Sequence, residues 1–168
     1  MILFALLLAL APQSRPEPDP LAPARGGRQE CLEPDMELRT CTSLVRYEFR
    51  PDGGVVAHQE LALQPGSGFV MRASIDMYER DGQVCFDRDY FGDVSFTRGG
   101  RPVDQALSDY LLVEVDNALA GDKYCSRYSA PRADGTILNT ASVDGALRPD
   151  LDATVLWVAP GDGYRVAP

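Results

Sequence analysis

Apolar and polar side chains alternate along much of the chain after Cys41. Between 69 and 77 every second residue is apolar, and Arg72 and Asp76 are among the residues that separate them. Because successive side chains of a strand point to opposite faces of a sheet, this alternation predicts half-buried strands. Turn-forming sequences such as Asp81-Gly82 separate the alternating runs. The strands of this predicted antiparallel meander cover residues 43–50, 55–63, 69–77, 83–90 and 94–97.

The spacing of apolar residues becomes helical after Pro102, with apolar residues now recurring three and four positions apart. Pro102 stands where a helix begins, and Gly121 is suited to the left-handed residue after a helix end. A strand over 110–115 is the alternative, because Leu112 and Val113 fill the gap in the helical stripe. Acidic and amide residues on the opposite side favour the helix. The stripe consists of Leu107, Tyr110, Leu111, Val115, Ala118 and Leu119.

Three further strands are predicted towards the C-terminus, at 123–129, 136–143 and 154–159. No internal repeat divides the chain, and a single domain is predicted over residues 31–168. A meander, a helix and a second group of strands are typical of an α+β fold. We therefore expect an α+β domain in which one packed α-helix covers a twisted antiparallel β-sheet.

An apolar run from Ile2 to Ala11 precedes this domain and predicts a signal-peptide-like segment over residues 1–11. As a helix this run would be about 15 Å long against a hydrocarbon core of about 30 Å, which excludes a transmembrane span. Pro12 follows the cleavage-like Ala9-Leu10-Ala11 sequence, so the cleavage site stays open. The predicted localisation is periplasmic or secreted, and the alternative is a buried N-terminal segment of a cytosolic protein.

Prolines dominate residues 12–30. Proline has no backbone N–H and biases the residue before it towards an extended conformation. The sequence therefore predicts a Pro-rich disordered tether over 12–30, with the folded domain starting near Cys31. The prolines of this stretch are Pro12, Pro16, Pro18, Pro20 and Pro23.

Four cysteines lie in the predicted domain, and none of their spacings is the C-x-x-C of a zinc or redox site. His58 is the only histidine, so a mixed set of Cys and His ligands cannot be completed. We therefore predict no metal and no cofactor. An even cysteine count after an export segment predicts two disulfides. Three pairings are possible, and the sequence favours Cys31 with Cys41 and Cys85 with Cys125.

Some segments of the domain are distinctive, namely Leu32-Glu33-Pro34-Asp35, Arg39-Thr40-Cys41-Thr42-Ser43-Leu44, Gly121-Asp122-Lys123-Tyr124-Cys125 and the closing residues 157–168. These segments resemble an uncharacterised family of small secreted or periplasmic four-cysteine proteins of alphaproteobacteria, which has no known activity. The resemblance implies export and a four-cysteine domain. It carries over no catalytic residue.

The formal net charge of −9 lies entirely on the predicted domain, because three arginines offset three carboxylates in residues 1–30. An acidic domain repels phosphate backbones and anionic membrane surfaces, so nucleic acid is excluded as an expected partner. An unknown protein partner, in particular a basic one, is compatible with this charge. The oligomeric state is left open.

His58 is the residue on which a general base near neutral pH would depend. It shares a face of its predicted strand with Glu60, so an imidazole and a carboxylate could be neighbours. The chain has no G-x-S-x-G sequence that would place a nucleophile on a strand-to-helix turn. The pattern therefore favours an exposed strand histidine, and no catalytic residue is assigned.

Asp87, Asp89 and Asp93 imitate the opening of a calcium loop. Position five of such a loop would be Phe91, and position twelve, which supplies a bidentate carboxylate, would be Arg98. A calcium ion would therefore have too few ligands, and these aspartates are interpreted as solvated residues.

These observations favour an exported, disulfide-stabilised envelope binding or interaction module without catalytic activity. An inhibitor-like protein whose acidic surface meets a basic partner, such as a lytic enzyme, fits this description. The alternatives are a small envelope hydrolase using His58 and nearby carboxylates, and a structural envelope component. The sequence favours a non-enzymatic role without deciding it.

Overall fold

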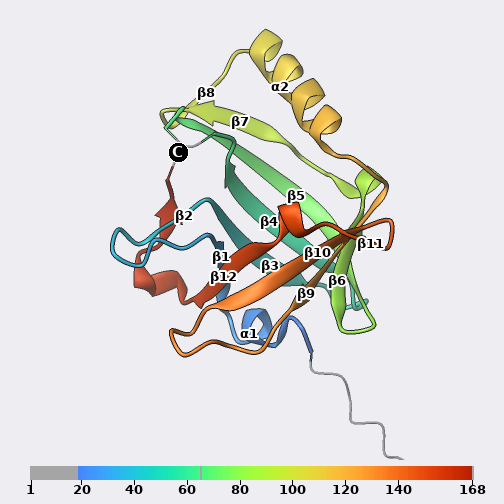
Figure 1. Ribbon diagram of the computed structural model, residues 1–168. Helices are drawn as coiled ribbons and strands as arrows, with labels where there is room; N and C mark the ends of the chain where they lie inside the picture. The colour runs from blue at the N-terminus through green and yellow to red at the C-terminus, as the bar shows by residue number, and fades with distance from the viewer. Residues whose placement is uncertain (1–18, 65, 168) are drawn as a thin grey trace, which may run out of the picture.

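Eight strands pair edge to edge until the sheet closes on itself in the computed structural model, which describes residues 19–64 and 66–167 (Figure 1). All pairings between these strands are antiparallel, and β4 pairs with β5 to complete the circle. Closure leaves the barrel strands without a free edge. In barrel order the strands are β4 (Val55–Ala62), β3 (Ser43–Phe49), β1 (Gln29–Leu32), β12 (Ala153–Val158), β10 (Ile137–Val143), β9 (Lys123–Tyr128), β6 (Gln83–Asp87) and β5 (Phe69–Arg80).

Shorter elements extend or cover this barrel. The N-terminal half of β5 also pairs with β7, which in turn pairs with β8, and β11 pairs with β10. The parallel pair β2 and β13 forms a separate small sheet. Their bounds are α1 (Ala22–Arg25), β2 (Thr40–Cys41), η1 (Arg88–Tyr90), β7 (Ser95–Arg98), β8 (Arg101–Pro102), α2 (Gln105–Ala118), β11 (Ala146–Leu147), η2 (Pro149–Leu151), η3 (Pro160–Asp162) and β13 (Arg165–Val166).

The alternation in the sequence becomes an inside and an outside of the barrel. On β5, Met71, Ala73 and Ile75 are buried in the core, whereas Arg72 and Asp76 are exposed. The predicted Asp81-Gly82 turn joins β5 to β6, and both of its residues have positive φ values, 51° and 67°. Such a turn matches the right-handed twist of the strands on either side.

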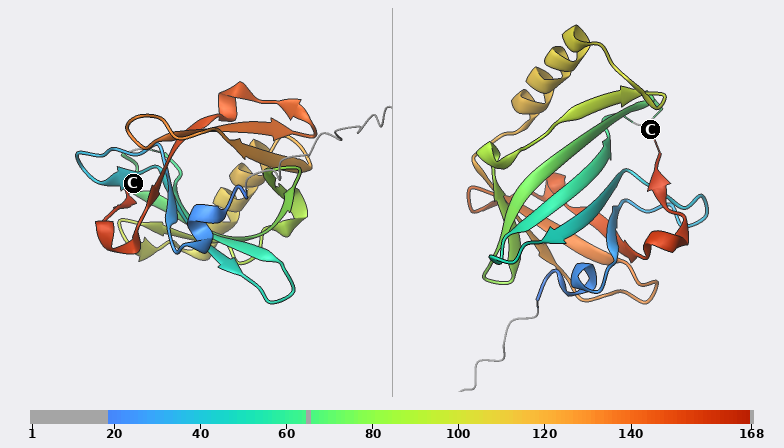
Figure 2. Two further views of the ribbon diagram at one scale, coloured as in Figure 1. Left: turned by 90° about the horizontal axis from the view of Figure 1, so that it is seen from below. Right: turned by 180° about the vertical axis from the view of Figure 1, so that it is seen from behind.

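The predicted α+β fold is wrong, because the sheet closes instead of packing against a helix. The helix expected after Pro102 is present as α2, with the Asp104 carboxylate accepting a hydrogen bond from the Leu107 N–H at its start. No residue of α2 is buried, and the helix lies beside β7 at the end of the molecule opposite α1 (Figures 1 and 2). Local alternation is the same in an open sheet and in a barrel, so it does not distinguish the two.

The expected tether does not extend to Glu30. Helix α1 occupies part of that stretch, and β1 begins at Gln29. Leu21 and Ala24 are buried among residues of the lower barrel end, where α1 lies across the opening (Figure 2, left). The predicted segment 1–11 and residues 12–18 of the tether lie outside the described residues.

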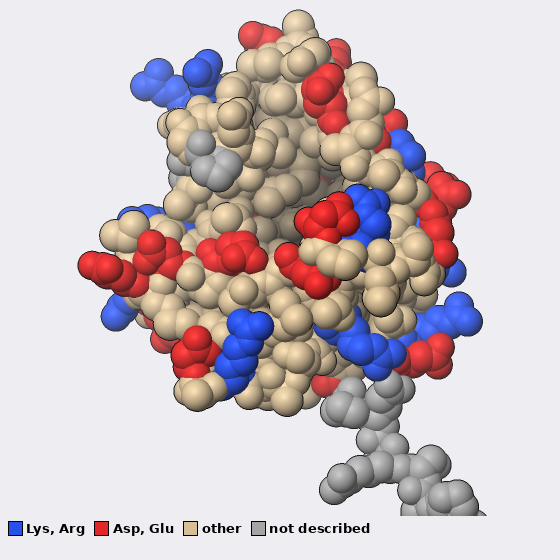
Figure 3. All heavy atoms as spheres, in the orientation of Figure 1, with Lys and Arg blue, Asp and Glu red and all other residues tan. Residues whose placement is uncertain are grey.

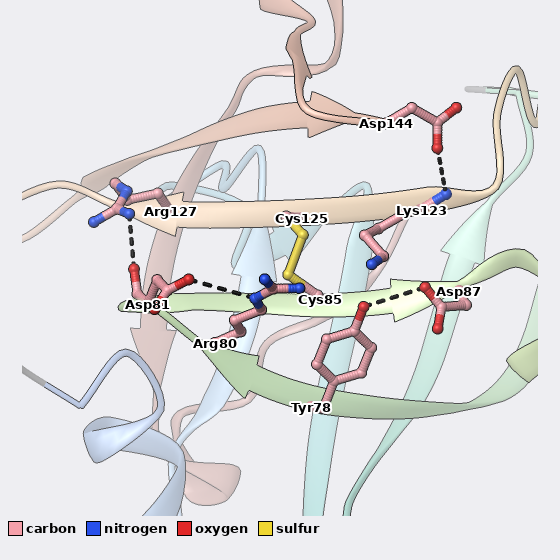
Figure 4. The surroundings of a disulfide bond; sticks show 9 residues. All are labelled: Tyr78, Arg80, Asp81, Cys85, Asp87, Lys123, Cys125, Arg127 and Asp144. Carbon is pink, nitrogen blue, oxygen red and sulfur yellow. Dashed lines mark hydrogen bonds and ion pairs between the residues drawn. A yellow bond between two sulfur atoms is a disulfide. The ribbon is translucent and has the colours of Figure 1, made fainter.

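Both disulfides have the pairing that the sequence favoured. Cys31 on β1 is bonded to Cys41 on β2, and Cys85 on β6 is bonded to Cys125 on β9. Cys85 and Cys125 are direct partners across neighbouring strands, as Figure 4 shows. On a chain-entropy estimate these bonds contribute about 3 and about 4 kcal/mol, because they close loops of 10 and 40 residues.

Gly121 has a different role from the predicted helix end. Helix α2 ends at Ala118, and Gly121 is not among the glycines with positive φ. A Cβ atom at Gly121 would lie 2.3 Å from Val143 Cγ1 and 2.6 Å from Asp144 Oδ2. The glycine therefore allows the segment after α2 to approach the end of β10.

We expect Gly121→Ala to lower the free energy of unfolding by about 1–3 kcal/mol, because the added methyl group overpacks this contact. Gly161→Ala is the matched control, since a Cβ there meets no heavy atom within 4 Å. Urea denaturation of both variants measures the difference. Equal stabilities would show that the approach at Gly121 relaxes without cost.

Candidate functional site

A carboxyl group lies inside the barrel. Glu30 on β1 is only 3% exposed. Its Oε2 accepts a short hydrogen bond from the Tyr47 hydroxyl, and its Oε1 accepts one from the Tyr128 hydroxyl at 3.0 Å. We call Glu30, Tyr47 and Tyr128 the interior carboxyl cluster.

Three strands that are distant in sequence build this cluster. Glu30 is opposite Val45 on β3 and opposite Trp157 on β12, which sets all three side chains towards the same face. Tyr47 follows two positions after Val45 on that face. Tyr128 comes from β9, which is separated from β1 by β12 and β10 in the barrel order, so it reaches Glu30 across the interior.

Burial dominates the electrostatics of the interior carboxyl cluster. It raises the pKa of Glu30 above the usual value of 4.5, and the hydrogen bonds from Tyr47 and Tyr128 lower that pKa by less. Burial, together with the nearby Glu30 charge, raises the pKa of Tyr47 and of Tyr128 well above 10.0. The two phenols therefore remain donors at neutral pH, and Glu30 keeps its proton to a higher pH than an exposed glutamate does.

The cluster faces a cavity of about 160 Å³. At roughly 30 Å³ per water molecule, this volume has room for about five waters or one small organic molecule. Small side chains such as Ala57 and Ser126 leave this space where larger ones would fill a barrel of this size. The lining consists of the polar residues Glu30, Tyr47, Gln59, Ser126, Tyr128 and Asn139 and the apolar residues Leu32, Val45, Ala57, Ile75, Met77 and Phe86.

Asn139, another polar residue of the lining, has a side-chain oxygen without a hydrogen-bond partner in the described part of the chain. Asn139 on β10 is 9% exposed, and its buried Oδ1 has no hydrogen-bond partner among the described residues. An unsatisfied buried acceptor typically costs about 1–3 kcal/mol. The residues that line the cavity thus include a carboxyl group and an amide oxygen that has no hydrogen-bond partner of its own in this part of the chain.

The two ends of the barrel differ. At the α1 end, an apolar groove of about 470 Å³ is lined by Pro20, Pro23 and Pro131 together with Tyr128 and Trp157. Tyr128 lines both this groove and the interior cavity. At the other end, the space-filling view shows a hollow below α2 (Figure 3).

His58 lies on the outside of the barrel, away from this cavity. Its Nδ1 is 3.2 Å from Ser74 Oγ, and its Nε2 is 3.2 Å from Glu48 Oε2. The expected neighbour Glu60 instead pairs with Arg72 at 2.9 Å. The structure therefore joins a hydroxyl, an imidazole and a carboxylate on β5, β4 and β3, beside an outer hollow of about 160 Å³.

The three aspartates of the calcium-like sequence do not converge. Asp87 accepts a hydrogen bond from the Tyr78 hydroxyl at 3.1 Å, as Figure 4 shows. Asp89 lines an exposed pocket with Asp87, whereas Asp93 lines the hollow beside His58. No group of three or more His, Cys, Asp or Glu side chains in the described part of the chain is arranged to hold a metal ion.

Exposed carboxylates and arginines are interleaved on the surface. Arg50 pairs with Asp76 at 2.8 Å, and Arg88 pairs with Asp116 at 2.6 Å. Acidic and basic side chains are mixed on the face drawn in Figure 3.

Within residues 19–64 and 66–167, no helix has the length and apolar character needed to cross a membrane. The chain matches no protein-family model, no curated protein and no solved structure. The resemblance to a family of four-cysteine proteins of alphaproteobacteria therefore stays a prediction.

Sequence reasoning missed the interior carboxyl cluster. Glu30 was assigned to the tether, where a glutamate beside prolines and arginines is expected to be solvated. A useful signal is its position next to Cys31, since a strand through that cysteine points both neighbours, Glu30 and Leu32, to the face opposite the cysteine. Asn139 lies in a predicted strand, but alternation alone does not show that its amide is inside a closed barrel.

Ionisation of Glu30 should make stability depend on pH. Because its pKa is higher in the folded protein, the free energy of unfolding should fall as the pH rises from about 4.5 towards the folded pKa. The fall is at most about 1.4 kcal/mol per pH unit for one proton. Glu30→Gln cannot ionise and should lose this fall, which urea denaturation between pH 4.5 and 8 measures.

The exposed Glu37 supplies the control for this comparison, as Glu37→Gln changes the net charge without touching the interior. Its stability profile should run parallel to that of the unaltered protein. If the stability of Glu30→Gln also changed with pH as that of the unaltered protein does, the buried carboxyl would not be the group responsible for the pH dependence.

Proposed function

We propose that this protein is a non-enzymatic, exported binding protein that encloses a small ligand inside its barrel. The observation that carries the proposal is the cavity of about 160 Å³ with the buried carboxyl of Glu30 and the unpartnered amide oxygen of Asn139. Small-molecule sites are typically apolar cavities with a few convergent polar groups, and this interior has that composition.

The barrel itself supports an interior site. An eight-stranded barrel is just wide enough for side chains to fill it or for one small ligand to be held. If the barrel interior were packed only for stability, apolar side chains would be expected to fill it, because a buried carboxyl without a cation is unfavourable. Glu30, Tyr47 and Tyr128 instead meet in the interior, as residues that serve a bound molecule would.

Two disulfides support the exported part of the proposal. Disulfides persist in oxidising compartments such as the periplasm or the exterior of the cell, and reducing conditions keep cytosolic thiols free. All four cysteines are paired in the structure. This agrees with the export expected from the apolar run at residues 2–11.

Filling the cavity should weaken binding. Ala57 is 2% exposed and lines the cavity, so the side chain of Ala57→Leu should occupy ligand space. With 1-propanol, propionate and propylammonium as probes, we expect at least one to change the fluorescence of Trp157, the only tryptophan, and Ala57→Leu to weaken its affinity at least about tenfold. Circular dichroism confirms that the variant is folded.

Ala146→Leu is the matched control, because Ala146 is exposed on β11. It should bind the probes as the unaltered protein does. If no probe binds at 10 mM, which corresponds to a free energy of roughly −3 kcal/mol, or if Ala57→Leu binds equally well, the interior is not the ligand site.

The second candidate is a small hydrolase, favoured by the contacts of His58 with Ser74 and Glu48. A base and a hydroxyl in hydrogen-bond reach are the minimum for nucleophilic catalysis. Ser74 lies within a stretch of β5 that is paired to β4, where the backbone amides form the hydrogen bonds between strands. His58 could therefore accept a proton from Ser74, but the arrangement offers no obvious hydrogen-bond donors to stabilise an oxyanion.

If this candidate holds, His58→Ala should lower the rate of p-nitrophenyl acetate hydrolysis by about 10²-fold or more, because the general base is lost. Ser74→Ala should lower it similarly, while Glu60→Gln should leave it unchanged, since Glu60 pairs with Arg72 and not with His58. A rate at the level of the uncatalysed reaction in the unaltered protein would eliminate the hydrolase.

A further inference from the structure

Two residues that carry acceptor groups line the interior cavity from different strands. Glu30 and Asn139 are 3% and 9% exposed, and both line the cavity. Each carboxyl oxygen of Glu30 receives one hydrogen bond from a tyrosine hydroxyl and keeps a further lone pair. Asn139 Oδ1 is buried without a partner in the part of the chain that the structure describes. These acceptors are complementary to a ligand that carries several N–H donors.

The interior carboxyl has no positive partner of its own. The titratable groups of the described residues that face Glu30 are the hydroxyls of Tyr47 on β3 and Tyr128 on β9, and the side chain opposite it on β12 is Trp157. Neither phenol carries positive charge. An ionised carboxylate in this position is disfavoured unless a cation accompanies it. A cationic ligand would supply the missing charge.

Three aromatic rings lie near Glu30, and two of them, Tyr47 and Tyr128, line the cavity. The Trp157 ring lies 6.0 Å from the Tyr47 ring and 5.8 Å from the Tyr128 ring, measured between centroids. The faces of tryptophan and tyrosine rings attract organic cations. The surroundings of Glu30 therefore favour positive charge as well as hydrogen-bond donors.

We propose that the ligand of this cavity is a small primary ammonium, whose N–H groups bind the Glu30 carboxylate and Asn139 Oδ1 beside the rings of Tyr47 and Tyr128. The inference rests on the proposed function, because it assumes that the barrel interior is the ligand site. As the ammonium binds, Glu30 releases its proton to solvent, so the bound pair is neutral overall. The volume of about 160 Å³ restricts the ligand to a few heavy atoms beyond the ammonium group.

The test compares three probes of similar size and different charge on the unaltered, disulfide-bonded protein. Propylammonium, 1-propanol and propionate are titrated while the fluorescence of Trp157 is measured at pH 5, 6, 7 and 8. We expect propylammonium to bind at least about tenfold more tightly than either other probe at pH 8. Its affinity should rise with pH, by up to about tenfold per unit, while Glu30 loses its proton.

Glu30→Gln isolates the carboxyl group, since glutamine keeps the size of glutamate. Its carbonyl oxygen can accept a hydrogen bond from one of the two tyrosine hydroxyls, and its NH2 group can donate one to the other. This variant should weaken propylammonium binding at least about tenfold and remove its pH dependence. The exposed Glu37→Gln controls for the loss of one negative charge and should bind as the unaltered protein does.

The outcomes separate this inference from the proposed function. If 1-propanol or propionate binds as tightly as propylammonium, or if the affinity for propylammonium falls as the pH rises, the ammonium is refuted while an interior ligand site stands. If no probe binds, both fail. The comparison of probes requires no variant, so it decides the question even if Glu30→Gln does not fold.

Discussion

Strand β1 is the element on which the barrel and its interior both depend. Its four residues, Gln29–Leu32, pair with β3 on one side and with β12 on the other. In this way the segment closes the N-terminal meander against strands from the C-terminal part of the chain. Without β1 the sheet would have two free edges there, each with unpaired backbone groups. Every residue that faces the cavity is placed by this closure.

The alternation along β1 gives its two faces different surroundings. Glu30 points into the barrel and meets Tyr47 and Tyr128, whereas Cys31 lies in a separate cluster with Cys41 and Val158. The disulfide on the outer side fixes the strand to β2, and the inner side carries a carboxyl group that burial destabilises when ionised. Stabilising contacts outside thus hold in place a polar group that would otherwise favour solvent. The proposed ligand site depends on this support.

Local structure followed closely from the sequence. Alternation predicted β3, β4 and β5, the Asp81-Gly82 turn lies where expected, and α2 forms where the apolar spacing became helical. Predictions that depended on distant contacts were less successful. The helix was expected to cover a sheet and does not, and the stretch before Cys31 was expected to be solvated although Leu21 is fully buried. The prolines of this stretch indicated its backbone preferences, but they did not show that the stretch covers one end of the barrel.

The sequence by itself determined which residues alternate, where turns interrupt the strands and which pairing of the four cysteines is favoured. Those properties depend on neighbours a few positions apart or on the length of the loop that a bond closes. Only the tertiary structure decided that the sheet closes, that Glu30 lies inside with Asn139, and that His58 lies outside with Ser74. Alternation shows which side chains share a face, but pairing between β1, β12 and β9 decides which face becomes the interior.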